Sequence, residues 1–188
     1  MTAKPEVPLL RETSAIFEAR SKWRYTGAAR PEFAENPSTG CESVWDYPRP
    51  PVIVKCSRRL KVYVDKICIA DTTAGVRVLE TAGAPTYYFP PEDVDMTQLE
   101  LQESTSVCEW KGAAQTITVA GRAEAAWRYI EMFPEFSQLY QWLSFYPAIL
   151  DCFIDDEQAN PQPGGYYGGW VTANLGGPIK GEPGSESW

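Results

Sequence analysis

The chain contains no histidine, so any chemistry must depend on other side chains. Catalysis by Ser-His-Asp or Cys-His groups is excluded, and so are histidine-ligated metal sites. The segment CEWKG, residues 108–112, offers Cys108 three residues before Lys111. In a continuous strand these side chains would point to opposite faces, whereas in a turn they could converge and the ammonium would favour the thiolate. Cys108 is therefore either a nucleophile or a small buried apolar group beside Trp110.

Carboxylates are the other candidates for chemistry. Asp93-Val94-Asp95 has the spacing that places two acids on one strand face, as metal-assisted nucleotidyl transfer requires. No Gly-Ser pair precedes it, so a turn that begins with aspartate is favoured. Asp71 and Glu80 each end an apolar β segment, where a buried carboxylate needs a partner. The basic residues that could supply it are Arg59, Arg77 and Lys111.

The segment PQPGGYYGGW, residues 161–170, carries two glycine pairs around a tyrosine pair. It matches neither the G-x-G-x-x-G dinucleotide motif nor the G-x-x-x-x-G-K-[ST] phosphate loop. A phosphate nest of glycine amides stays open as an alternative, but tight turns with rings packed on bare backbone are favoured. We expect residues 158–188 to lie over the sheet as a strap, anchored by Tyr166, Tyr167 and Trp170.

The elements that would position these residues are mostly short strands. Alternating apolar residues predict a β-hairpin over 60–71, with a two-residue turn at Asp65-Lys66. Further strands are expected at 76–79, 87–89, 116–119, 126–129, 142–146 and 151–154. Residues 5–22 predict a short N-terminal helix, and 131–143 could form another that Pro134 and Pro147 keep short. The pattern indicates a mainly β, antiparallel fold.

Three segments of one structural domain are expected: an N-terminal helix and extended arm (1–59), a β core (60–157) and the strap (158–188). The aromatics of ESVWDYPRPP, residues 42–51, should pin the arm to the core. The net charge of −8 argues against nucleic acid as a partner. No apolar run predicts a membrane span or a signal peptide, so we expect a cytoplasmic protein. The oligomeric state stays open.

Taken together, several motifs resemble the domain-of-unknown-function family 427, which also carries the label of a nucleotidyltransferase domain. They are ESVWDYPRPP, IADTT (69–73), VLET (78–81), PTYYFPPEDV (85–94), CEWKG, AAW-Y (125–129), FYP (145–147) and PQPGGYYGGW. The shared core covers about residues 60–147. The resemblance implies a compact antiparallel domain similar to the β-tent fold. Some β-tent proteins hold zinc through cysteine pairs, but the five cysteines here lack that spacing. We therefore expect neither a metal nor another cofactor.

Aromatic residues complete the candidate site, since the chain holds seven tryptophans. Our leading hypothesis is a pocket for a small planar or cationic ligand, with the rings either lining it or only packing the core. Its expected residues are Tyr87, Tyr88, Trp110 and Lys111, with Asp71 and Glu80 as polar anchors. One alternative is a metal-dependent nucleotidyl- or phosphate-transfer enzyme, for which Cys108, Lys111 and Asp71 are the catalytic candidates. The other is a protein-interaction module.

Overall fold

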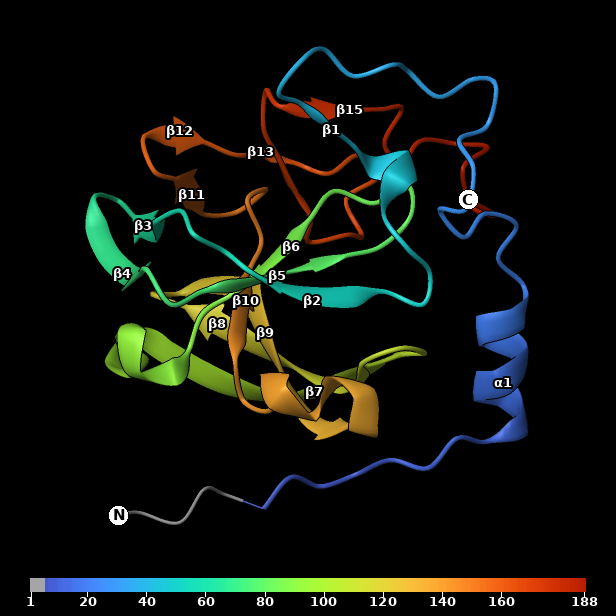
Figure 1. Ribbon diagram of the computed structural model, residues 1–188. Coiled ribbons are helices and arrows are strands. Elements are labelled where there is room, and N and C mark those ends of the chain that lie inside the picture. The colour runs from blue at the N-terminus through green and yellow to red at the C-terminus, as the bar shows by residue number, and fades with distance from the viewer. Residues whose placement is uncertain (1–5) are drawn as a thin grey trace.

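The computed structural model describes residues 6–188 and shows a mainly β fold with antiparallel sheets. The largest sheet has the order β10-β9-β8-β7 and forms the lower part of Figure 1. Its strands are β7 (Leu99–Cys108), β8 (Gly112–Val119), β9 (Arg122–Met132) and β10 (Leu143–Phe145). In β8, buried and less buried residues mostly alternate, because one face of the sheet covers the core. β7 is an exposed edge strand, and its sequence lacks the alternation of apolar residues that would predict a strand.

The predicted hairpin is confirmed in a second sheet of order β12-β11-β3-β4. Its strands are β3 (Leu60–Val64), β4 (Ile67–Thr72), β11 (Asp151–Ile154) and β12 (Glu157–Gln158). Asp65 and Lys66 form the turn between β3 and β4, with φ of 48° and 72°. Two successive positive φ values are the geometry of a type I′ turn, whose twist suits a two-residue hairpin.

A three-stranded sheet, β2-β5-β6, lies between the other two in Figure 1. Its strands are β2 (Val52–Lys55), β5 (Val76–Leu79) and β6 (Thr86–Tyr88). Phe89 continues from β6 and pairs with Leu143 of β10, which joins this sheet to the large one. Tyr87 and Tyr88 are neighbours on β6, so their side chains enter different cores. Tyr87 packs against Trp170, whereas Tyr88 packs near Trp127 and Tyr129.

Short 3-10 helices connect these strands: η1 (Val44–Asp46), η2 (Pro91–Asp93), η3 (Met96–Gln98) and η4 (Pro134–Leu139). The helical alternative for 131–143 is thus realised only as η4, which Pro134 begins. The ends of the predicted span belong to strands, since β9 ends at Met132 and β10 begins at Leu143. Asp93 ends η2 and Asp95 caps η3, so Asp93-Val94-Asp95 forms turns, as favoured from the sequence.

The N-terminal helix α1 (Ser14–Ser21) is shorter than the predicted span of 5–22. Thr13 caps it by accepting a hydrogen bond from the backbone amide of Ile16 (3.4 Å). The described residues before Thr13 are extended, because Leu10 donates its backbone amide to Met132 at the end of β9 (2.8 Å). Residue 5 lies outside the described residues. Among the residues that are described, no helix is long and apolar enough to cross a membrane.

The C-terminal strap (158–188) lies across the upper part of the molecule in Figure 1 and is not a loose tail. β13 (Asn160–Pro161) pairs with β14 (Trp170–Val171), and β15 (Leu175–Gly176) pairs in parallel with β1 (Glu42–Ser43) of the arm. Trp170 is fully buried and donates its indole N–H to the carbonyl of Phe145 (2.9 Å). Tyr166 is 75% exposed, so its predicted anchoring role is wrong.

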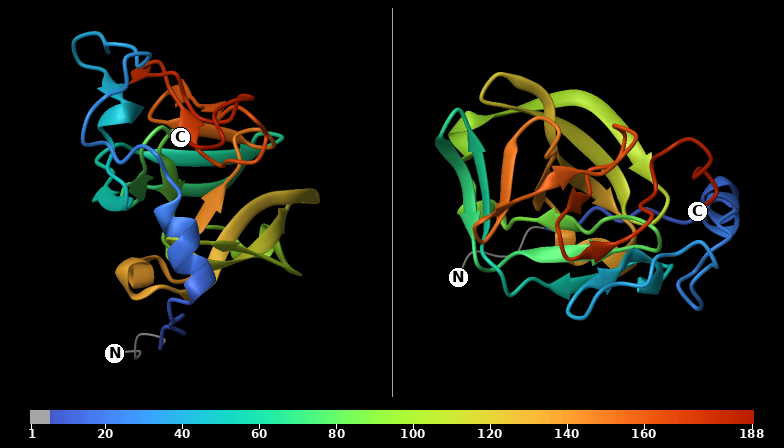
Figure 2. Two further views of the ribbon diagram at one scale, coloured as in Figure 1. Left: turned by 90° about the vertical axis from the view of Figure 1, so that its right-hand side faces the viewer. Right: turned by 90° about the horizontal axis from the view of Figure 1, so that it is seen from above.

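The arm is pinned by its aromatics, as expected. Trp45 and Tyr47 are buried, and Trp45 packs edge-on against Tyr25 and Phe33. The chain that leaves α1 runs beside the C-terminus, where the backbone amide of Arg24 meets the carbonyl of Ser187 (3.4 Å) (Figures 1 and 2). The segment that follows α1 and the C-terminal residues therefore lie side by side.

Candidate functional site

The CEWKG motif forms the turn between β7 and β8. β7 ends at Cys108 and β8 begins at Gly112, so the intervening residues leave the sheet. Gly112 has a φ of 128°, and a Cβ there would lie 2.2 Å from the carbonyl oxygen of Glu131. Only glycine fits this close approach to β9. Cys108 and Lys111 converge in the turn, which is the second of the two geometries considered from the sequence.

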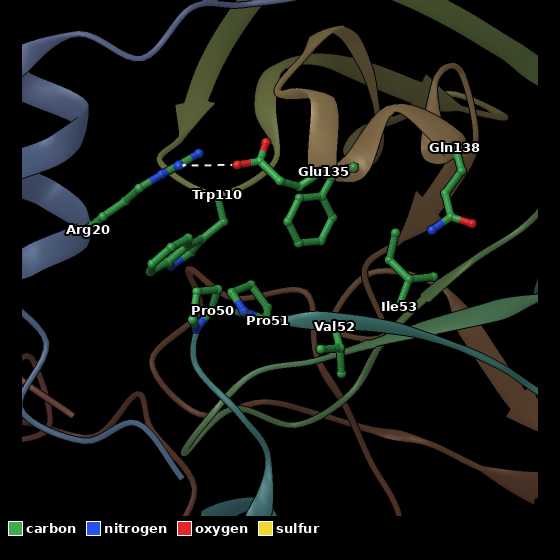
Figure 3. Close-up of a pocket in the computed structure, with 9 residues that line it drawn as sticks. Arg20, Pro50, Pro51, Val52, Ile53, Trp110, Glu135 and Gln138 are labelled. Carbon is green, nitrogen blue, oxygen red and sulfur yellow. Dashed lines mark ion pairs between the residues drawn. The ribbon is translucent and has the colours of Figure 1, made fainter. Parts of the chain in front are cut away.

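Trp110 lines a pocket of about 360 Å³ between α1, β2, this turn and η4 (Figure 3). We name it the Trp110 pocket; its lining residues are Arg20, Pro50, Pro51, Val52, Ile53, Trp110, Glu135, Phe136 and Gln138. The lining combines two aromatic rings and an aliphatic wall with three polar side chains. Such a mixture is typical of sites that bind small molecules.

Arg20 is the best-fixed polar group of the pocket. Its Nε donates to the carbonyl of Glu109 (2.7 Å) and its Nη1 to the carboxylate of Glu12 (2.8 Å). Its guanidinium lies 5.2 Å from the Trp110 ring centroid and 4.6 Å from that of Phe133. Glu135 is a second, longer ion-pair partner at 3.6 Å, drawn as the dashed line in Figure 3. Two carboxylates thus offset the charge of Arg20, so the pocket has no strong preference for an anion.

A polar group lies on the other side of the turn, where Lys111 approaches Tyr88, Cys108 and Glu80. Burial disfavours the charged form of Lys111, but Cys108, Tyr88 and Glu80 outweigh this effect and raise its pKa above the ordinary value. Burial also raises the pKa of Tyr88 to about 12, although Lys111 opposes the shift. At neutral pH, Tyr88 is therefore a neutral phenol.

Glu80 joins this group to a second set of side chains. The sequence suggested Arg59, Arg77 or Lys111 as its partner, but the ion pair forms with Arg49, whose Nε is 3.1 Å from Glu80. The Arg49 side chain is only 3% exposed and also donates to the backbone carbonyls of Tyr25 and Thr81 (both 2.9 Å). Arg77 instead pairs with Glu42 (2.8 Å). Arg49 was overlooked because it lies in the proline-rich arm, 31 residues before Glu80.

Lys180 lies in this second set, which we name the Lys180 cluster: Trp23, Arg49, Glu80, Glu109, Tyr167 and Lys180. Its ammonium is 3.6 Å from the ring centroid of Trp23 and 5.5 Å from that of Tyr167. Arg49 approaches the same Trp23 ring at 4.6 Å. The Trp23 indole N–H donates to the carboxylate of Glu109 (3.0 Å), which precedes Trp110 in the turn. The Lys180 cluster and the Trp110 pocket therefore share the CEWKG turn.

The predicted site residues are only partly brought together. Glu80 and Tyr88 both act electrostatically on Lys111, and Trp110 belongs to the same turn as Lys111. Asp71 lies on β4 and accepts two hydrogen bonds from Arg59 (2.7 and 2.6 Å). Arg59 was one of the three partners expected for it from the sequence. Tyr87 lies in the core beneath Trp170. These two residues lie apart from the Trp110 pocket and the Lys180 cluster.

Metal-ligating residues are not gathered in the described part of the chain, where no group of three or more Cys, Asp or Glu could hold an ion. The Asp93 carboxylate accepts from the Thr72 hydroxyl (2.6 Å), whereas Asp71 belongs to the ion pair with Arg59. The five cysteines are free thiols.

The comparison with known families covers the β core of the chain. Residues 52–156 match the model of a family described as a domain of unknown function, DUF427, and labelled NTP_transf_9. The match spans more than half of the chain, which therefore belongs to this family. The resemblance stated from the sequence motifs is confirmed. No curated protein matches the chain.

The site draws on residues inside and outside the matched segment. Residues 52–156 contribute Trp110, Lys111, Glu80 and η4. The arm before it contributes Arg20, Trp23 and Arg49, and the strap contributes Tyr167 and Lys180. Sequence reasoning missed the basic residues of both arms. The one available signal was at Arg49, which follows Tyr47 by two residues in a segment rich in proline.

Proposed function

We propose that the protein binds a small planar ligand in the Trp110 pocket. The observation that carries this proposal is the pocket itself, with a volume of about 360 Å³ and rings on two of its walls. That volume lies near the lower end of the range for small-molecule sites, which is about 300–1,000 Å³. A single aromatic or heteroaromatic ring with a polar edge fits both the size and the lining.

The polar side chains favour a ligand of low net charge. Arg20 is already paired with Glu12 and lies near Glu135, so a carboxylate ligand would compete with two acids of the protein. Gln138 is exposed at the rim and can both donate and accept a hydrogen bond. A heteroaromatic amide or amine matches this arrangement, since Gln138 can bind its polar edge while Trp110 and Phe136 cover its ring.

The test is a titration with a panel of small heteroaromatic amides, amines and acids. Binding should be followed by tryptophan fluorescence and by saturation-transfer NMR from protein to ligand. Trp110→Phe should weaken binding of the best amide or amine by about tenfold, because the larger indole face is lost. Trp142→Phe is the control, since Trp142 is a partly buried tryptophan that does not line the pocket. Its affinity should match that of the unaltered protein.

Two results would contradict the proposal. One is that no compound of the panel binds with a dissociation constant below about 1 mM, which is weak even for fragments of this size. The other is that Trp110→Phe and Trp142→Phe have equal effects. In that case, binding does not depend on the Trp110 pocket.

A further inference from the structure

Glu135 is the charged residue of the Trp110 pocket whose binding capacity is least used. It lines the pocket next to Phe136, and its side chain is 59% exposed (Figure 3). The distance of 3.6 Å between its carboxylate and Nη1 of Arg20 is longer than a hydrogen bond. Arg20 therefore leaves the oxygens of Glu135 free to accept hydrogen bonds from a ligand, and a carboxylate can accept several at once.

Arg20, the other charged residue of the pocket, is held by groups that do not line it. Its Nη1 donates to the carboxylate of Glu12 (2.8 Å), and its Nε donates to the backbone carbonyl of Glu109 (2.7 Å). The charge of Arg20 is thus offset at closer range by Glu12 than by Glu135. Taken together, Arg20, Glu12 and Glu135 leave an excess of one negative charge at the pocket.

The remaining features of the pocket suit a planar cation. Trp110 and Phe136 present aromatic rings, and a ring face attracts positive charge. The net charge of the chain, −8, favours the approach of a cation over that of an anion. Gln138 does not discriminate between charges, because its uncharged amide can both donate and accept. Glu135 is therefore the lining residue that can select a ligand by its charge.

We propose that Glu135 makes the Trp110 pocket selective for planar aromatic cations with two adjacent N–H donors, such as an aryl amidine or a protonated aminoheteroarene. This inference rests on the proposed function and names the ligand class within it. Two N–H groups side by side match the two oxygens of a carboxylate and form paired, charge-assisted hydrogen bonds. The single positive charge of such a ligand also balances the excess negative charge at the pocket.

Three compounds of nearly equal shape test the proposal on the full chain. Benzamidine, benzamide and benzoate share one ring and a planar substituent, which at neutral pH is positive, neutral and negative in turn. Their dissociation constants should be measured by titration calorimetry and by saturation-transfer NMR. We expect benzamidine to bind about fivefold more tightly than benzamide, and benzoate to bind most weakly. Added salt should weaken the binding of benzamidine and leave that of benzamide unchanged.

Glu135→Gln assigns the selectivity to one side chain, because it removes the charge and keeps the shape. The substitution should weaken the binding of benzamidine about fivefold and leave that of benzamide unchanged. Glu131→Gln is the matched control, since Glu131 is also an exposed glutamate, near the end of β9, and does not line the pocket. It changes the net charge of the chain equally and should leave both affinities as they are in the unaltered protein.

The neutral amide separates a failure of this inference from a failure of the proposed function. If benzamide binds as tightly as benzamidine, or if Glu131→Gln weakens benzamidine as much as Glu135→Gln does, Glu135 does not select the ligand and the inference is wrong. The proposed function still stands in that case, provided that Trp110→Phe weakens binding. If neither these three compounds nor the wider panel bind with a dissociation constant below about 1 mM, both are wrong.

Discussion

Tyr88 and Trp110 each hold a buried polar atom for which residues 6–188 provide no hydrogen-bond partner. The atoms are the Tyr88 hydroxyl oxygen and the Trp110 indole nitrogen. Leaving a buried polar group unsatisfied costs about 1–3 kcal/mol. Both residues lie in the aromatic core next to the candidate site. Their aromatic rings therefore stabilise the fold while their polar atoms do not.

Replacing Tyr88 by phenylalanine should raise the free energy of unfolding by about 1 kcal/mol, because an unsatisfied hydroxyl leaves the core and the ring stays. Urea denaturation followed by circular dichroism measures the change. Tyr47→Phe is the matched control, since the Tyr47 hydroxyl donates to Glu42 (2.8 Å) and its loss should destabilise the protein by about 1 kcal/mol. If both substitutions destabilise equally, the Tyr88 hydroxyl has a partner.

At the scale of elements, the β3–β4 hairpin contains a lysine in an unfavourable backbone conformation. Lys66 has a φ of 72°, which glycine adopts at little cost and a residue with a Cβ does not. Lys66→Gly should therefore raise the free energy of unfolding by about 0.5–1 kcal/mol. Thermal and urea denaturation would check this. Lys61→Gly, within β3, should have the opposite sign, and stabilisation by both would remove the turn as the cause.

The strap contains a glycine that packing requires. A Cβ at Gly169 would lie 2.2 Å from the side-chain oxygen of Gln162 and 2.7 Å from the backbone oxygen of Ala84. Gln162 is buried and bonded to Ala84 and Lys180, so it cannot easily move. Gly169→Ala should lower the free energy of unfolding by about 2 kcal/mol or more.

Gly165→Ala is the control within the strap, because Gly165 has a positive φ but a Cβ added there would meet nothing within 4 Å. The substitution should lower the free energy of unfolding by only about 1 kcal/mol, which is the cost of a left-handed alanine. Equal losses for the two substitutions, measured by urea denaturation, would mean that the backbone conformation and not the close approach makes glycine necessary.

Elements with a regular apolar pattern could be predicted from the sequence. The β3–β4 hairpin shows both the alternation and a two-residue turn, and the structure confirms it. β7 could not be found in this way, because its QESTS segment (102–106) lies on an exposed edge where no face needs apolar residues. The helix predicted over 5–22 is too long at its N-terminal end. The backbone amide of Leu10 donates to the carbonyl of Met132 and not to a carbonyl within a helix. Pairing with the end of β9, and not local sequence preference, therefore sets the conformation of the residues before α1.

At the scale of the whole molecule, the candidate site depends on contacts between distant segments. The CEWKG turn could be singled out from the sequence, and with it Trp110 and Lys111. Its neighbours could not: Arg20 reaches the carbonyl of Glu109 across 89 positions, and Trp23 reaches the Glu109 side chain across 86. No local pattern encodes such pairs. The arms from both ends of the chain complete a site that residues 52–156 form only in part.

The buried tyrosines should make the free energy of unfolding of the whole protein fall at alkaline pH. Burial raises the pKa of Tyr87 and of Tyr88 to about 12, and raises that of Tyr129 well above its ordinary value of 10. Above pH 10 the unfolded chain therefore loses phenolic protons that the folded chain keeps. Stability is fully present below pH 10 and is lost as the pH rises towards 12. Lys180 has the opposite effect, because its pKa is lowered in the folded chain. It makes stability rise with pH, but only between about pH 8 and 10.5, where the unfolded chain keeps a proton that the folded chain has lost.

Between pH 10.5 and 12, each of these tyrosines contributes up to about 1.4 kcal/mol per pH unit to the fall in stability. Lys111 and Cys152, whose pKa values are also raised, act in the same direction. Urea denaturation across this range, with tyrosinate absorbance recorded in parallel, should show a steep loss of the unfolding free energy. Tyr88→Phe should make the slope shallower by about one such contribution, because it removes one of the titrating phenols. An unchanged slope in this variant, or constant stability up to pH 12, would show that the buried tyrosines ionise as readily in the folded chain as in the unfolded one.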